Sequence, residues 1–157
     1  MNKAIKSQNE QKISNDKRLA VIRVRGINSV RTRIEATLKT LMLYKNNYCC
    51  VLNDNSVNNG MLKKVKDYIT WGEVDDETFN LLVDKRGEEF KGRPTDSKQK
   101  IKYNNFFVIN NKKIKKYFRL NAPRKGFGRK GIKQPFTEGG ALGYRGAVIN
   151  DLIKRMI

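Results

Sequence analysis

Residues 98–137 contain thirteen Lys and Arg residues and no Asp or Glu. A protein that only has to be soluble does not need such a segment, because a solvated surface normally mixes charges of both signs. Residues 1–33 are also basic, with nine cationic and two acidic side chains, whereas residues 34–97 are close to neutral. We therefore expect a globular middle between two basic flanks that bind a polyanion.

The 157-residue chain has a formal net charge of +19, and nucleic acid is the partner that such an excess favours. An anionic membrane is the alternative. However, the sequence offers no basic amphipathic helix and no apolar run of 18 residues, so no membrane is expected. It also has no His, the commonest general acid–base and metal ligand. We expect no enzyme, no cofactor, no metal and no small-molecule substrate.

Hydrophobic periodicity predicts alternating strands and helices in the near-neutral part of the chain. Strands are expected at 19–26, 48–52 and 69–73, where β-branched residues are frequent. A helix is expected at 30–43, capped by Asn28 or Ser29. One further helix is expected after each of the two later strands, capped by Asn58 or Asn59 in the first case and by Asp75 or Asp76 in the second. The order predicts a small α/β sandwich with helices on one face of a sheet.

The region after the third helix is less regular. Thr95 or Asp96 could cap a short helix, and residues 106–109 and 117–120 could pair as a hairpin. Apolar residues at helical spacing over 148–156 predict a final amphipathic helix.

Two adjacent cysteines, Cys49 and Cys50, fall within the second predicted strand. Neighbouring residues of a strand point to opposite faces, so a disulfide between them would be strained. We expect two buried, reduced thiols.

These patterns divide the chain into five parts. Residues 1–17 are expected to form a flexible basic arm, 18–74 a βαβαβ core, and 75–122 additional helices and short strands. Residues 123–146 are expected to form a basic RNA-binding loop, and 147–157 a C-terminal helix.

Within the basic loop, cations alternate with glycines and aromatic residues. Glycine would let the backbone approach phosphates, the cations would neutralise them, and Phe127 could stack on an unpaired base. The alternative is a disordered loop with incidental apolar residues. The predicted RNA-clamping residues are Arg124, Lys125, Phe127, Arg129, Lys130, Lys133 and Arg145.

Further RNA contacts are expected on both sides of this loop. Arg23 and Arg25 share one face of the first predicted strand. Arg31 and Arg33 lie in the first turn of a helix, where cations oppose the helix dipole, and this cost indicates a functional use. Lysines before the loop would extend its surface: Lys112, Lys113, Lys115 and Lys116.

An acidic run, Asp75-Asp76-Glu77, could hold Mg²⁺ in an enzyme that acts on RNA. Helix capping and the helix dipole explain the same residues, and no ligand spacing supports a metal site.

Three stretches resemble a known family: 20–26 (AVIRVRG), 60–72 (GMLKKVKDYITWG) and 136–140 (FTEGG), the last preceded by Pro123-Arg124 and followed by the final helix. Together they resemble the L-thirty family of large-subunit ribosomal proteins, in the archaeal and eukaryotic form that is called L-seven in eukaryotes. Residues 88–118 do not resemble the family closely.

The resemblance implies an α+β protein with a βαβαβ core related to the ferredoxin-like fold, plus appended helices and a basic loop. It implies no catalytic activity and no cofactor. It further implies a structural constituent of the cytoplasmic ribosome that binds large-subunit rRNA, near 5S rRNA and neighbouring ribosomal proteins. The alternative is a free-standing RNA- or DNA-binding module, such as an RNA chaperone, which would share the charge pattern.

Overall fold

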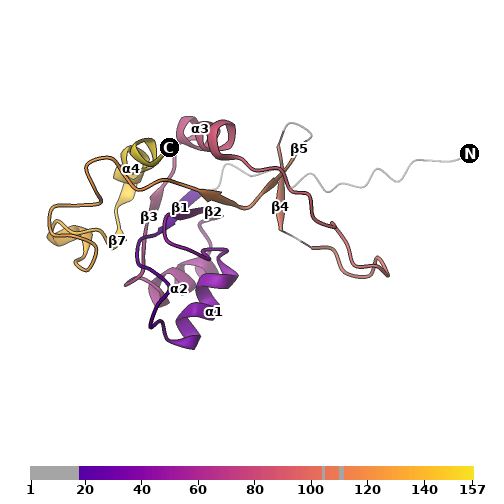
Figure 1. Ribbon diagram of the computed structural model, residues 1–157, viewed down its shortest axis with the longest axis horizontal. Helices are drawn as coiled ribbons and strands as arrows, with labels where there is room; N and C mark the ends of the chain where they lie inside the picture. The colour runs from indigo at the N-terminus through magenta and orange to yellow at the C-terminus, as the bar shows by residue number, and fades with distance from the viewer. Residues whose placement is uncertain (1–17, 104, 110–111) are drawn as a thin grey trace, which may run out of the picture.

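A computed structural model describes residues 18–103, 105–109 and 112–157, so the arm expected over 1–17 lies outside the described residues. A five-stranded sheet with strand order β6-β2-β1-β3-β7 lies at the centre (Figure 1). Its strands are β1 (Arg18–Arg23), β2 (Tyr48–Asn53), β3 (Ile69–Glu73), β6 (Tyr117–Arg119) and β7 (Gly143–Tyr144). β1 is antiparallel to both β2 and β3, β6 is antiparallel to β2, and β7 is parallel to β3.

Helices cover both faces of this sheet. On one face lie α1 (Thr32–Thr40) and α2 (Ser56–Lys64), which are the helices of the expected βαβαβ core. On the other face lie α3 (Asp76–Arg86) and α4 (Ile149–Met156) (Figure 1). The expectation of helices on one face therefore holds for the first pair only. The fold class is α+β, with the expected ferredoxin-like core.

β1 is apolar on both sides because both sides are covered. Leu19 and Val21 belong to the core under α1 and α2, while Ala20 and Ile22 belong to the core under α3 and α4. Each of these four side chains is at most 3% exposed. Successive residues of β1 therefore point into opposite cores.

α1 is shorter than predicted at both ends. Its N-cap is Arg31, which makes no side-chain capping bond, and not Asn28 or Ser29. Ser29 and Met42 adopt φ values of 57° and 59° in the loops on either side. These left-handed conformations end the helical backbone at positions that residue type alone does not mark.

The predicted hairpin between 106–109 and 117–120 is wrong. β4 (Phe106–Ile109) pairs with β5 (Lys112–Lys115), whereas β6 joins the main sheet beside β2. Phe118 of β6 is fully buried in the core under α3 and α4, and burying a Phe side chain outweighs the stability of an isolated hairpin. The expected helix at Thr95 is also absent, since Thr95 forms a bridge with Lys102.

β4, β5 and residues 88–103 form a projection from the body of the molecule (Figure 1). Phe90 and Phe106 stack with their ring centroids 5.1 Å apart. Residues 88–90 pair with β5 through two backbone hydrogen bonds, from Phe90 to Lys113 and from Lys115 to Glu88. This small cluster gives the projection its own packing.

Both cysteines are buried free thiols on opposite faces of β2, as predicted. Burial raises the pKa of Cys49 to about 12 and raises that of Cys50 well above its usual value.

We expect no reaction of the native protein with a thiol reagent at pH 8, and two reactive thiols per chain in denaturant. In the unfolded chain the thiols have an ordinary pKa of about 8.5, so above pH ~8.5 the unfolded state loses protons that the native state keeps. The free energy of unfolding should therefore fall as the pH rises above about 8.5. Rapid labelling of the native protein would contradict this placement.

Candidate nucleic-acid interface

Of the loop expected over 123–146, residues 143–144 form β7, and the name basic loop is kept from here on for the cationic part, residues 123–134. It lies at the left end of the molecule in Figure 1, beside β7 and α4. A tight turn begins it, closed by a hydrogen bond of 3.0 Å from the backbone N–H of Gly126 to the carbonyl of Pro123. The guanidinium of Arg155 in α4 donates to the carbonyls of Arg124 and Gly126, each at 3.0 Å. The start of the loop is therefore fixed to the last helix.

Lys125 occupies the third position of this turn with φ 65°. A side chain in the left-handed region costs roughly 1 kcal/mol relative to glycine. Backbone strain of this kind is concentrated at functional sites, where the surrounding structure imposes it. Here the bonds from Arg155 hold the strained residue between two fixed carbonyls.

Two glycines are needed where the chain crosses itself. A Cβ on Gly128 would lie 2.5 Å from the carbonyl oxygen of Gly140, and a Cβ on Gly140 would lie 2.2 Å from that of Gln134. Both distances are shorter than any van der Waals contact. The sequence predicts glycines that let the backbone approach phosphates. At Gly128 and Gly140 the missing side chain instead lets two segments of the protein's own backbone pack closely together.

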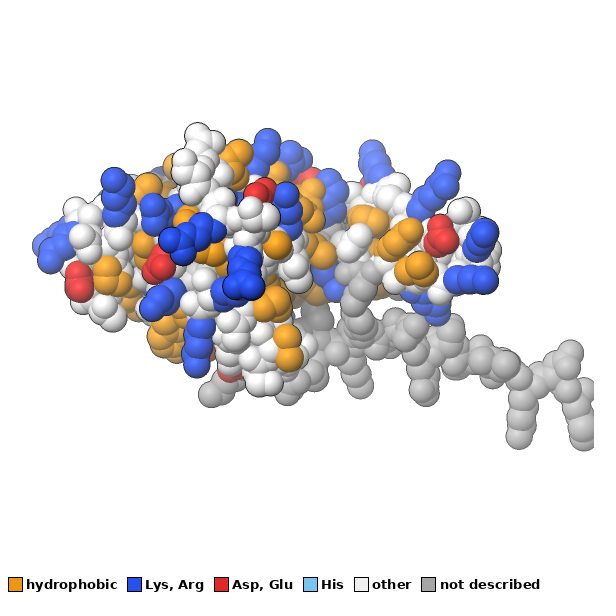
Figure 2. Space-filling model, turned by 90° about the horizontal axis from the view of Figure 1, so that it is seen from below, with side chains coloured by type: hydrophobic (Ala, Val, Ile, Leu, Met, Phe, Trp, Pro, Cys, Tyr) orange, Lys and Arg blue, Asp and Glu red, His pale blue; other side chains and the backbone are white. Residues whose placement is uncertain are grey.

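Five of the predicted RNA-contacting cations are exposed on this loop: Arg124, Lys125, Arg129, Lys130 and Lys133. None of them forms an ion pair with a carboxylate in the described part of the chain. Lys and Arg side chains are spread over the same end of the molecule in Figure 2, with few acidic ones among them. The loop thus presents a positive surface that is not neutralised from within the described protein.

Arg145 lies beneath this surface and is only 5% exposed. Its guanidinium donates to the Oγ1 atom of Thr70 at 2.8 Å and to the carbonyls of Phe127 and Ala141 at 3.0 Å. It also stacks over the ring of Phe136, at 4.6 Å from the centroid. Burial lowers its pKa to about 10, which still leaves it charged at neutral pH. Its placement makes it an anchor between loop and sheet and not a surface cation.

Phe127 was expected to stack on a base, but its ring is half-buried. It packs against the core under α3 and α4 and against a small cluster of Val24, Ala141 and Leu142. Its carbonyl is one of the acceptors of Arg145. Phe127 therefore fixes the loop from inside.

Arg23 has the same kind of role at the far end of β1. It is 2% exposed, and it donates to the carbonyls of Leu43 at 2.8 Å, Gly26 at 2.9 Å and Arg25 at 3.0 Å. Burial lowers its pKa. The guanidinium ties together two chain segments and is not at the surface where RNA contact was expected.

The other predicted cations of the N-terminal region lie at or near the surface. Arg31 and Arg33 are exposed at the start of α1. Arg25 is half-buried and lies over the ring of Tyr68, at 5.0 Å from the centroid.

The four predicted lysines of the projection are in different environments. Lys112 and Lys113 are exposed, whereas Lys115 forms an ion pair of 2.7 Å with Glu88. Lys116 is half-buried and lies over the ring of Phe107. The projection and the basic loop lie at opposite sides of the body in Figure 1. The lysines therefore form a second basic region and do not extend the loop.

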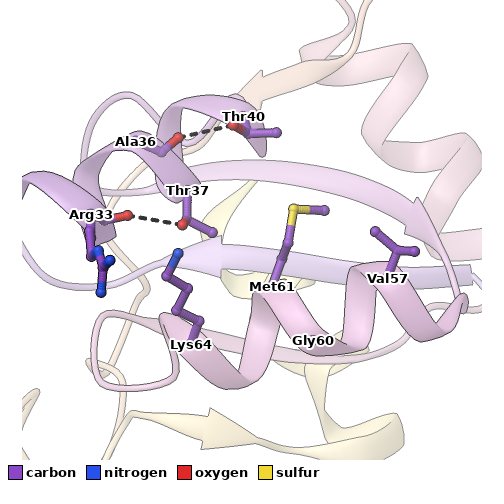
Figure 3. A pocket seen from close by; sticks show the side chains of 8 residues that line it. All are labelled: Arg33, Ala36, Thr37, Thr40, Val57, Gly60, Met61 and Lys64. Carbon is purple, nitrogen blue, oxygen red and sulfur yellow. Dashed lines mark hydrogen bonds between the residues drawn. The ribbon is translucent and has the colours of Figure 1, made fainter.

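A groove of about 470 Å³ lies between α1 and α2. Figure 3 shows Arg33 and Lys64 at one end of it, Met61 in the middle and Val57 at the other end. The remaining lining residues are small or weakly polar: Ala36, Thr37, Thr40 and Gly60. The groove thus has a positive end, and the rest of its lining is apolar or weakly polar.

Nor does the acidic run form a metal site in the described residues. Asp75 is the N-cap of α3, and Asp76 pairs with Arg18 at 2.5 Å. Within 18–103, 105–109 and 112–157, no three His, Cys, Asp or Glu side chains come close enough to hold a metal ion. No helix in those ranges is long and apolar enough to cross a membrane.

Sequence reasoning missed Arg155, because a cation in the last turn of a helix is usually explained by the helix dipole. Its pair with Asp151 one turn earlier, at 3.1 Å, is a local feature that the sequence does show. Its bonds to the loop carbonyls join residues that are 29 and 31 positions apart, which no local pattern reveals.

Comparison with known proteins gives the same assignment as the sequence motifs. The family described as "Ribosomal protein L30p/L7e" matches residues 19–69. The large ribosomal subunit protein uL30 of Methanopyrus kandleri is 42% identical over 149 residues, which cover 85% of this chain and 100% of the relative. The uL30 protein of Nanoarchaeum equitans is 44% identical, with 88% and 97% covered. That of Methanococcus maripaludis is 42% identical, with 88% and 98% covered. These matches extend along almost the whole fold, and the chain belongs to the L30p/L7e family of ribosomal proteins.

Proposed function

We propose that this protein is a structural constituent of the large ribosomal subunit and binds large-subunit rRNA through the basic loop. The observation that carries the proposal is the loop itself: five exposed cations, with no carboxylate partner among the described residues, on a backbone held by buried Arg145 and by Arg155. Full-length similarity to proteins named as large ribosomal subunit proteins supports the same function.

The physical basis of binding is neutralisation of phosphates. Each cation that contacts a phosphate releases condensed counterions, which gives affinity without sequence specificity. A loop whose backbone is already fixed loses less conformational entropy on binding than a mobile one. Hydrogen bonds from Arg145 and Arg155 therefore raise affinity even though Arg145 itself is buried.

Additional contacts are proposed at a distance from the loop. Arg31 and Arg33 at the start of α1, and Lys112 and Lys113 on the projection, are exposed and could reach other segments of a folded RNA. We further propose that the protein lies near 5S rRNA and among neighbouring ribosomal proteins in the cytoplasm. No catalytic step is proposed.

Sedimentation of a cell lysate through a density gradient, followed by a high-salt wash, tests this function. We expect the protein to stay with the large subunit after the wash, because many phosphate contacts and burial among other components act together. The small subunit from the same gradient is the control and should lack the protein. Recovery with free protein or with DNA would instead favour a free-standing nucleic-acid-binding module.

A further inference from the structure

Three tyrosines form an aromatic cluster at the β6 edge of the sheet. Tyr48 and Tyr117 stack, with ring centroids 5.3 Å apart and 15° between their planes. Tyr44 stands perpendicular to both rings, with its centroid 5.8 Å from that of Tyr117 and 6.4 Å from that of Tyr48. Tyr44 remains 46% exposed although it contacts both partners.

The cluster is held by the fold and not by the tyrosines alone. Tyr117 stands opposite Cys50 in the β2–β6 register, and Cys50 lies in the core under α1 and α2. Tyr48 packs against that same core. Next to the third ring, the buried guanidinium of Arg23 bonds the carbonyls of Leu43 and Tyr44. The rings are therefore pre-positioned, and a ligand would not have to order them.

Cations surround the cluster in excess over carboxylates. Arg119 lies opposite Tyr48, and Lys115 lies 5.6 Å from the centroid of Tyr117. Both bind the same carboxylate, that of Glu88, so one negative charge is shared between two positive ones. Arg119 keeps 59% of its side chain exposed. Lys45, next in the chain to Tyr44, is also exposed.

From this geometry we infer that the tyrosine cluster, Tyr44 with Tyr48 and Tyr117, stacks an unpaired nucleobase of RNA. Aromatic faces bind unpaired bases and not paired ones, and the flanking phosphates would lie against exposed cations such as Arg119 and Lys45. The positive surroundings favour RNA over a protein partner. The inference rests on the proposed function, but it concerns a separate site remote from the basic loop.

The test uses the full chain and two probes: a single-stranded oligoribonucleotide that carries one 2-aminopurine, and a duplex of the same length. Tyr44→Ala should weaken binding of the single strand by about 5- to 100-fold and remove the quenching of 2-aminopurine fluorescence. The slope of affinity against salt should not change, since Tyr44 neutralises no phosphate. Binding of the duplex should also be unaffected.

Two matched variants separate stacking from general damage. Tyr44→Phe keeps the ring and should retain affinity for the single strand within about two-fold, because stacking needs no hydroxyl. Tyr144→Ala removes a tyrosine of similar exposure (52%) from the opposite edge strand and should leave quenching intact. Circular dichroism establishes that each variant is folded.

Unchanged affinity and quenching in Tyr44→Ala would overturn the inference, and binding of a protein partner would then be the remaining function for the cluster. An equal loss in Tyr144→Ala would overturn it too. If a variant of the basic loop still loses RNA affinity in either case, the proposed function stands without this site. If the loop variant also binds normally, the proposed function fails with it.

Discussion

Replacement of Arg124, Lys125, Arg129 and Lys130 together by Ala is expected to weaken RNA binding by about two to three orders of magnitude at 0.15 M salt. All four side chains are exposed and have no carboxylate partner in the described structure, so their charge is available to phosphates. Little stability should be lost, because the loop is held by Arg145 and Arg155, which are unchanged.

The measurement is the dissociation constant for an rRNA fragment over a range of salt concentrations. Four lost phosphate contacts should reduce the slope of log affinity against log salt by about 3–4. A variant with four other exposed lysines replaced, Lys63, Lys64, Lys66 and Lys85, loses the same charge elsewhere and is the matched control. Equal slopes in the wild type and the loop variant would refute the assignment of the loop.

Arg145→Met is expected to destabilise the free protein by about 2–4 kcal/mol. Met fills a similar volume but leaves the carbonyls of Phe127 and Ala141 without their buried donor. The loop would then lose its link to β3, which Arg145 makes through Thr70. Urea unfolding measures the loss in stability, and amide exchange of residues 124–134 measures the loosening of the loop.

Arg23→Met is the control for this variant, since Arg23 is also a buried arginine bonded to carbonyls, at a different site. Both variants should lose stability, but only Arg145→Met should loosen the loop. With a duplex RNA as the ligand, which the tyrosine cluster beside Arg23 does not bind, we expect its affinity to fall about ten-fold below that of Arg23→Met, because the loop must be ordered again on binding. Similar affinities in the two variants would show that loop anchoring contributes nothing to binding.

The two buried arginines also show the limit of reasoning from charge along the chain. In the sequence, Arg23 and Arg145 are indistinguishable from Arg31 or Arg124, since all are cations in basic or glycine-rich surroundings. Their different roles depend on carbonyls that converge from separate segments, such as Phe127 and Ala141 around Arg145. A residue's charge is local information, but its solvation is decided by everything that packs around it.

The strands of the sheet follow the same rule. The bounds of β3 were predicted as observed because residue type is local information, whereas the partner of 117–120 was predicted wrongly. The sequence of a short apolar segment does not indicate which strand it pairs with. Its pairing beside β2 is decided by the space that Phe118 fills under α3 and α4.

Residue types and their spacing were enough to predict the alternating strands and helices from β1 to α3, the final helix α4 and the two buried thiols. All of these depend on residue type and spacing over a few positions, where side-chain direction is set by the backbone period. The anchoring roles of Arg23 and Arg145, the pairing of β6 and the contact of three tyrosines at one edge become apparent only in the folded chain. These features join residues that are distant in the chain, and the free energy that selects them comes from packing and burial, which exist only once the chain has folded.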